Sequence, residues 1–170
     1  MKLTRATEKD IPLIQDLARK SWEHAYAEIL SAEQMEYMLF TMYSMEEIAA
    51  QLQLPLYHYY LIKDESDSSY GGFVGYENGY EEKTTKLHRI YLVPESKGKG
   101  VGKYVLGFLK EKTAEYGDRR IILNVNKYNP ARNFYESQGF RIYDKGVFDI
   151  GNGFVMDDYL MEFCLENQEN

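Results

Sequence analysis

The chain has 170 residues, of which 44% are apolar and 28% are charged, a balance typical of a globular protein. Its formal net charge of −7 argues against nucleic acid as the main partner, because phosphate contacts need a positive surface. No apolar stretch approaches the roughly 18 residues of a membrane helix, and residues 1–7 do not resemble a secretory signal. We therefore expect a cytoplasmic protein without membrane contact.

Hydrophobic periodicity and turn residues divide the chain into strands and helices. We expect strands over residues 2–6, 56–63, 70–77, 84–93, 120–125, 140–149 and 154–165. We expect helices from Thr7 or Asp10 to about Ala25, and over residues 32–42, 45–52, 101–117 and 130–138. Residues 64–69 are too polar for a regular element, and Gly151-Asn152-Gly153 is typical of a hairpin turn.

The order of these elements predicts a mixed sheet with helices on its faces. The strand at 84–93, the glycine turn, the following helix and the strand at 120–125 form a crossover, which indicates a parallel strand pair. A chain of this length fits one domain, which we place at residues 1–167, with residues 168–170 as a tail.

The turn Lys97-Gly98-Lys99-Gly100-Val101-Gly102-Lys103 follows a strand and opens a helix. It fits neither a Walker A loop, which needs Ser or Thr after Gly-Lys, nor the Gly-x-Gly-x-x-Gly pattern of a dinucleotide fold. Glycines 98, 100 and 102 would take positive φ angles and let the backbone approach an anion. The helix N-terminus beyond them attracts negative charge.

Lysines gather around this turn in an otherwise acidic chain. Residues 97–112 contain five lysines and one acidic residue, Glu111. A local basic cluster of this kind suggests a site for an anion. Together with the glycine turn and the helix N-terminus, it suits a diphosphate attached to a larger ligand. The alternative is a tight strand-to-helix turn whose lysines only face solvent.

Two motifs resemble those of the GNAT superfamily of N-acetyltransferases. Residues 87–103 are similar to its acetyl-CoA motif, in which Arg/Gln-x-x-Gly-x-Gly/Ala reads Lys97-Gly98-Lys99-Gly100-Val101-Gly102 here. Residues 124–140 resemble Asn-x-x-Ala-x-x-Phe-Tyr-x-x-x-Gly-Phe, with one residue fewer between Asn and Ala, so that both Asn126 and Asn129 fit. The segment Met156–Met161 is also similar to bacterial polyamine acetyltransferases.

The resemblance implies the acyl-CoA N-acyltransferase fold. This is an α/β fold with a central, twisted, mostly antiparallel sheet, a splayed parallel strand pair, and helices on both faces. The co-substrate would be acetyl-CoA or another acyl-CoA. It would be held by the backbone of Leu92 and Val93, by the cradle of Lys97, Gly98, Lys99, Gly100, Val101, Gly102 and Lys103, and by Asn126 or Asn129.

The resemblance also implies catalytic roles, each with a structural alternative. Tyr135 would protonate the leaving thiolate. His88 is a candidate base, with a water chain past Tyr91 as the alternative. Trp22, Tyr26 and Tyr91 would form the acceptor pocket, although aromatic residues can equally be core residues. Cys164 is expected to be a buried inert thiol rather than a nucleophile.

The expected activity is direct transfer of an acetyl group to a primary amine of a small molecule or peptide, with a polyamine as one candidate. The alternative is a non-catalytic acyl-CoA-binding sensor on the same fold. His24 and His58 have no partner at metal-ligand spacing, so no metal is expected. Edge strands and exposed tyrosines permit a homodimer.

Overall fold

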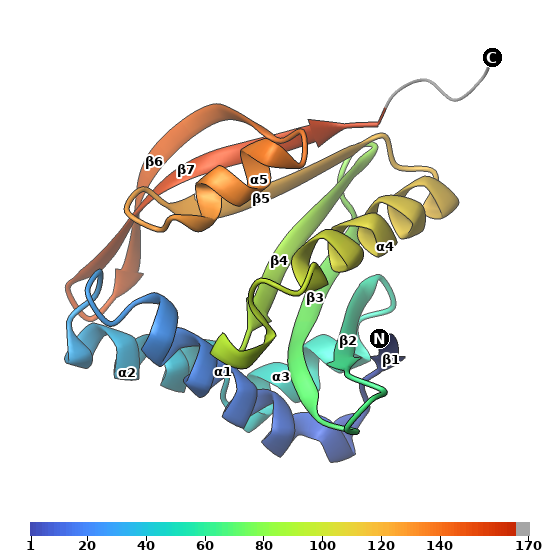
Figure 1. Ribbon diagram of the computed structural model, residues 1–170. Helices are drawn as coiled ribbons and strands as arrows, with labels where there is room; N and C mark the ends of the chain where they lie inside the picture. The colour runs from blue at the N-terminus through green and yellow to red at the C-terminus, as the bar shows by residue number, and fades with distance from the viewer. Residues whose placement is uncertain (166–170) are drawn as a thin grey trace. The chain divides into compact units, whose positions relative to one another are not determined.

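The computed structural model describes residues 1–165, along which the chain forms seven β-strands and five α-helices (Figure 1). The strands are β1 (Lys2–Arg5), β2 (Tyr57–Lys63), β3 (Tyr70–Glu81), β4 (Thr84–Leu92), β5 (Arg120–Asn126), β6 (Arg141–Gly151) and β7 (Phe154–Cys164). The helices are α1 (Ile11–Ala25), α2 (Ala32–Met42), α3 (Met45–Gln53), α4 (Val101–Tyr116) and α5 (Ala131–Ser137), with 3-10 turns η1 (Glu8–Asp10) and η2 (Pro94–Ser96).

This order of elements confirms the sequence prediction. The expected domain end at residue 167 and the tail at 168–170 lie outside the described residues. The strands form one sheet in the order β1-β2-β3-β4-β5-β7-β6. β4 and β5 are parallel, whereas β1–β2, β2–β3, β5–β7 and β6–β7 are antiparallel. The parallel register runs only from Thr84–Arg120 to Lys86–Ile122 although both strands are longer, as a splayed pair requires.

By its internal contacts the chain divides into two compact units. The first contains Met1–Glu77 and His88–Val105, and the second contains Asn78–Leu87 and the residues from Leu106 onward. Strands β3 and β4 and helix α4 therefore contribute residues to both units. The glycine turn and His88 belong to the first unit, and Tyr135 belongs to the second.

Helix α1 shows how the first unit is built from its sequence pattern. Residues at helical spacing along it are buried: Ile11, Ile14, Leu17, Ala18 and Trp22. Asp10 occupies the N-cap position of α1, but its carboxylate makes no capping hydrogen bond to that helix and instead accepts from the backbone N–H of Thr7 at 2.9 Å across the η1 turn. Pro12 then lies in the first turn of α1, where its missing N–H costs no helical bond.

Arg89 of β4 lies in the core of the first unit with only 7% of its surface exposed. Its Nη1 donates to the Tyr59 hydroxyl at 2.6 Å, and its guanidinium lies 4.4 Å from the centre of the Tyr43 ring. Burial lowers the pKa of Arg89, but the surrounding tyrosines raise it further than burial lowers it. Arg89 therefore stays charged and links β4 to the helical layer through Tyr43 and Gln51.

Removing this buried cation should destabilise the fold. We expect Arg89→Ala to lower the free energy of unfolding by about 3 kcal/mol, because a large side chain is lost from a packed core. Arg19→Ala is the matched control: Arg19 is half exposed and pairs with Glu36 at 2.6 Å. Its loss should cost less than about 1 kcal/mol, as for exposed ion pairs. Equal denaturation midpoints for the two variants in urea would contradict this role of Arg89.

Strand β3 is longer than predicted. Asn78-Gly79 has the composition of a hairpin turn, but the strand continues to Glu81 and turns at Glu82–Lys83. Gly79 takes φ +63°, and its N–H donates to the carboxylate of Asp118 at 2.9 Å. The same carboxylate accepts from the Thr85 hydroxyl at 2.7 Å. A buried acid outside the strand therefore stabilises the irregular backbone at this point.

Two arginines hold a buried carboxylate on β7 of the second unit. Glu162, 7% exposed, accepts from Arg120 Nε at 2.8 Å and from Arg141 Nε at 2.9 Å. Burial raises the pKa of Glu162, but the hydrogen bonds from Arg120 and Arg141 outweigh burial and leave the pKa below its usual value. Cys164, two residues further on, is exposed rather than buried as predicted. It is the last residue of β7 and lies beyond the buried residues Met161 and Glu162.

The lowered pKa of Glu162 makes a testable pH dependence. A group with a lowered folded pKa stabilises the fold above its unfolded pKa, and this contribution is lost as pH falls through the folded pKa. At pH 7, Glu162→Gln should therefore cost about 1.5–3 kcal/mol, the range for hydrogen bonds to charged groups. The difference from wild type should shrink between about pH 5 and pH 3 in urea unfolding. Glu136→Gln, half exposed, is the control and should change little. A difference independent of pH would contradict the assignment.

Candidate active site

The glycine turn leaves β4 through the η2 turn and enters α4. The N–H of Lys97 donates to the Pro94 carbonyl at 3.2 Å, and the helical pattern starts where Tyr104 N–H donates to the Gly100 carbonyl at 3.1 Å. Gly98 and Gly100 take φ angles of +80° and +75°, which L side chains rarely adopt. Gly102 does not follow the prediction of a positive φ, because it already lies in the first turn of α4 and has helical geometry.

The exposed side of this turn is open and positively charged. A Cβ atom added at Gly98 or Gly100 would meet no other atom within 4 Å. Lys97, Lys99 and Lys103 are all exposed around it. The N–H groups in the first turn of a helix have no partner inside that helix, and the helix dipole adds partial positive charge. The turn therefore has the shape and charge to hold a diphosphate.

The backbone groups of Val93, just before the turn, already make hydrogen bonds within the protein. Val93 donates its N–H to the Gly71 carbonyl of β3 at 2.9 Å, and its carbonyl accepts from Ser96 N–H at 2.9 Å. Only the second lone pair of the Val93 carbonyl remains for a ligand.

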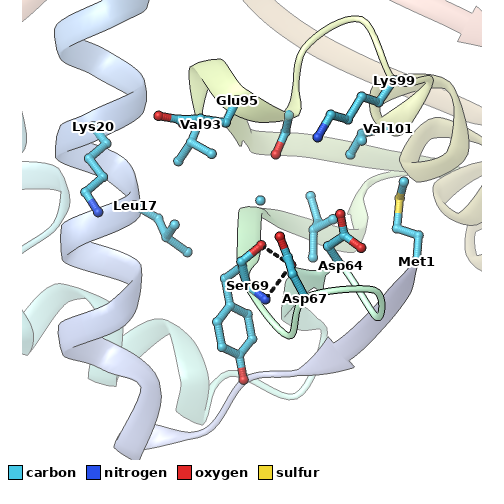
Figure 2. A pocket seen from close by; sticks show the side chains of 14 residues that line it. Met1, Leu17, Lys20, Asp64, Asp67, Ser69, Val93, Glu95, Lys99 and Val101 are labelled. Carbon is cyan, nitrogen blue, oxygen red and sulfur yellow. Dashed lines mark hydrogen bonds between the residues drawn. The ribbon is translucent and has the colours of Figure 1, made fainter.

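A pocket of about 400 Å³ lies beside the glycine turn in the first unit (Figure 2). Figure 2 shows Glu95 and Lys99 on one side of it and Asp64 and Asp67 of the predicted loop on the other. Hydrogen bonds from Ser66 hold the pKa of Asp64 below its usual range, and Ser69 does the same for Asp67. The pocket therefore combines both signs of charge. Its lining includes Lys99 and Val101 but none of the predicted acceptor residues.

Those acceptor residues lie together elsewhere in the first unit. The ring of Trp22 lies 4.8 Å from that of Tyr26 and 5.6 Å from that of Tyr91. Trp22 and Tyr26 are 1% and 5% exposed. Tyr43 and Phe73 join the same cluster, each within 6.4 Å of the Tyr91 ring. The structure therefore brings the three predicted residues together, but with Trp22 and Tyr26 in the core.

His88 has two partners that sequence reasoning missed. Its Nε2 lies 3.0 Å from Oε1 of Glu77 on β3, and its ring stacks on Tyr57 of β2 with centroids 4.9 Å apart and planes at 16°. The side chains of His88 and Glu77 are 22% and 30% exposed. One signal could have found Glu77: it lies five residues before Glu82 and His88 five residues after Lys83, so a hairpin turn at that pair places them opposite each other.

The remaining predicted residues lie in the second unit. Asn126 accepts from Tyr128 N–H and Asn129 from Ala131 N–H, both at 2.9 Å, so each side-chain oxygen shapes the turn that leads into α5. Tyr135 of α5 is 8% exposed, and its ring lies 5.6 Å from Phe134 and 5.7 Å from Phe140. Along residues 1–165, no group of three or more His, Cys, Asp or Glu could hold a metal ion, and no helix is long and apolar enough to cross a membrane.

Comparison with known proteins gives consistent matches along most of the chain. The acetyltransferase (GNAT) family model matches residues 15–140. An uncharacterized N-acetyltransferase from the pepI 3′ region of Lactobacillus delbrueckii subsp. lactis is 24% identical over 171 residues, which cover 98% of this chain and 96% of the relative. A spermidine N(1)-acetyltransferase of Thermoplasma acidophilum is 27% identical over 163 residues, covering 92% and 96%.

The fold is also that of solved acetyltransferases. The crystal structure of the PaiA N-acetyltransferase of Thermoplasma acidophilum, in complex with coenzyme A, has a TM-score of 0.79 at 24% identity and covers 96% of this chain and 98% of that one. A GCN5-related N-acetyltransferase from Rhodopseudomonas palustris has a TM-score of 0.80 at 18% identity, covering 96% and 95%. The chain belongs to the acetyltransferase (GNAT) family and is an acyl-CoA-dependent N-acetyltransferase.

Proposed function

We propose that this enzyme transfers the acetyl group of acetyl-CoA directly to a primary amine of a small molecule, with polyamines as the first candidates. The glycine turn carries the proposal: Gly98 and Gly100 expose backbone at positive φ, with open space above it, at the N-terminus of α4. In the proposal this cradle of residues 97–103 binds the pyrophosphate. The backbone of Leu92 and Val93 holds the pantetheine arm, and Asn126 or Asn129 adds a further contact.

The proposed chemistry needs three proton transfers and no acyl-enzyme. His88 takes a proton from the substrate ammonium, and the neutral amine nitrogen attacks the thioester carbonyl carbon. The carbon–sulfur bond then breaks, and the Tyr135 phenol protonates the departing thiolate. The second proton that the acetylated nitrogen gives up restores the phenol. Trp22, Tyr26 and Tyr91 are proposed to shape the acceptor side. Because Trp22 and Tyr26 are buried, they would act mainly by supporting Tyr91, the more exposed ring.

Polyamines are favoured by similarity and by charge. The relative that is 27% identical over nearly the whole chain is a spermidine N(1)-acetyltransferase. The net charge of −7 favours approach of a polycation. A sensor that binds acyl-CoA without reaction is not favoured, since both relatives are named as N-acetyltransferases and Tyr135 occupies the acid position of the motif.

A panel of amines tests the proposal. The enzyme is mixed with acetyl-CoA and, in separate reactions, with spermidine, spermine, amino acids, aminoglycosides and a peptide with a free N-terminus. Release of free thiol is followed, and reactions without amine serve as blanks. The proposal predicts the highest kcat/KM with a polyamine. Thiol release only with amino acids or peptides would overturn the polyamine assignment. Absence of thiol release with every amine of the panel would overturn the proposed transfer.

A further inference from the structure

We infer that Glu77 is a positioning residue that orients His88 and keeps it ready to accept a proton. The inference rests on the proposed function, in which His88 is the base. Glu77 comes from β3 and His88 from β4, and Nε2 and Oε1 are 3.0 Å apart. An ionised carboxylate only accepts hydrogen bonds, so Nε2 must carry the hydrogen. This fixes the tautomer in which Nδ1 holds the lone pair.

The imidazole plane is fixed from a second direction by Tyr57. The Tyr57 ring stacks on His88 at 16°, and Tyr57 itself is 5% exposed and stacks on Tyr59 at 5.3 Å. A ring held by a carboxylate at its edge and an aromatic ring on its face has little freedom to rotate. Such orientation is what a proton acceptor needs in order to meet one substrate nitrogen.

The carboxylate of Glu77 favours the protonated form of His88. Glu77 of β3 and Tyr57 of β2 are titratable groups that contact His88. Burial raises the pKa of Tyr57, so its phenol stays neutral during turnover. Lys86 and Arg89 flank His88 on its own strand and carry positive charge. Glu77 therefore supplies the negative charge that stabilises the imidazolium after it has taken the substrate proton.

The proton path is balanced in this scheme. The substrate ammonium loses a proton to Nδ1 of His88, and the imidazolium forms while Nε2–H still donates to Glu77. After attack, His88 returns the proton to solvent, and no proton passes to Glu77. Glu77 thus touches neither substrate nor the thioester, and its effect is carried entirely by the orientation and charge of the imidazole.

The test compares pH profiles of Glu77→Gln and Glu81→Gln with the best amine from the panel. Glu81 lies on the same strand, and its exposed carboxylate is 3.7 Å from Arg120 rather than beside His88, so its loss removes the same charge without the contact. In Glu77→Gln, the acidic limb of kcat/KM should move to lower pH by about half a unit to one unit. Its plateau should fall about 5–10-fold, as a correctly oriented acid–base group contributes about 10²-fold or more. Glu81→Gln should match wild type, and Glu77→Asp should keep most of the activity.

An NMR titration of the His88 ring gives a readout apart from activity. The chain has three histidines, so single His→Gln variants assign the signals. His88 should titrate at lower pH in folded Glu77→Gln than in wild type. Equal titration of His88 in both proteins, or equal profile shifts in Glu77→Gln and Glu81→Gln, would overturn the inference while leaving amine acetylation intact. Failure of the proposed function is a different result: wild type would release no thiol with any amine of the panel.

Discussion

Replacing Gly100 with valine should abolish acetyl-CoA binding while the protein still folds. Gly100 has φ +75°, and its missing side chain leaves open space on the side where the cradle would meet the pyrophosphate. A valine there would block that approach and force the turn to change its backbone conformation, at a cost of about 1–3 kcal/mol. Calorimetry should detect no binding. Acetyl-CoA at a hundredfold excess over Kd should stabilise wild type by about 2.7 kcal/mol and so raise its melting temperature. The melting temperature of the variant should not change.

Gly153→Val separates backbone strain from loss of the cradle. Gly153 has φ +79° and equally open surroundings, but it lies in the β6–β7 turn. This control should lose similar stability and bind acetyl-CoA normally. Normal binding by Gly100→Val would mean that the pyrophosphate lies elsewhere, and loss of binding in both variants would trace the effect to stability alone.

The Tyr135→Phe variant should keep its fold and its affinity for acetyl-CoA but lose about 10²–10⁴-fold in kcat, the usual contribution of a positioned acid. The substitution removes one hydroxyl and almost no volume from a residue packed against Phe134 and Phe140. The loss should be smaller with an acyl donor whose thiol leaves more readily, because that thiolate needs less protonation. Stopped assays at saturating amine and acetyl-CoA measure the effect.

Tyr128→Phe is the matched control for this prediction, since Tyr128 precedes α5 and is 74% exposed. It should have wild-type turnover. A Tyr135→Phe enzyme within about threefold of wild type would exclude the phenol as an essential acid. A lower melting temperature with unchanged turnover per folded molecule would assign Tyr135 a structural role.

Local patterns predicted most of the fold. Hydrophobic periodicity predicted a helix at residues 32–42, and the structure has α2 at Ala32–Met42. The ends of the other elements were predicted within a few residues, because apolar spacing and caps act over short distances. The exception was β3. There the sequence Asn78-Gly79 favours a turn locally, but the distant carboxylate of Asp118 stabilises that backbone within a strand. A tertiary contact of this kind leaves no local signal in the sequence.

The sequence predicted the parts of the candidate site that depend on backbone conformation. It did not predict the side-chain contacts between residues on different elements. The glycine turn is readable because positive φ selects glycine, and Gly98 and Gly100 confirm this. Arg89 and Glu77 were missed because their roles come from residues on other elements, Tyr59 and His88. Glu77 can be placed opposite His88 only if the hairpin turn is at Glu82–Lys83. The predicted strand ended at residue 77, so this turn was not predicted.

The central claim is direct transfer of the acetyl group to an amine, and mass spectrometry tests it most directly. The protein is first incubated with acetyl-CoA alone, then with the amine identified by the panel, and the masses of protein and amine are followed with free thiol. We predict an unchanged protein mass throughout, with one acetylated amine formed for each thiol released. An acetylated protein that forms before the amine is added and then disappears would contradict the claim. Cys164→Ser would show whether the exposed thiol carries that group.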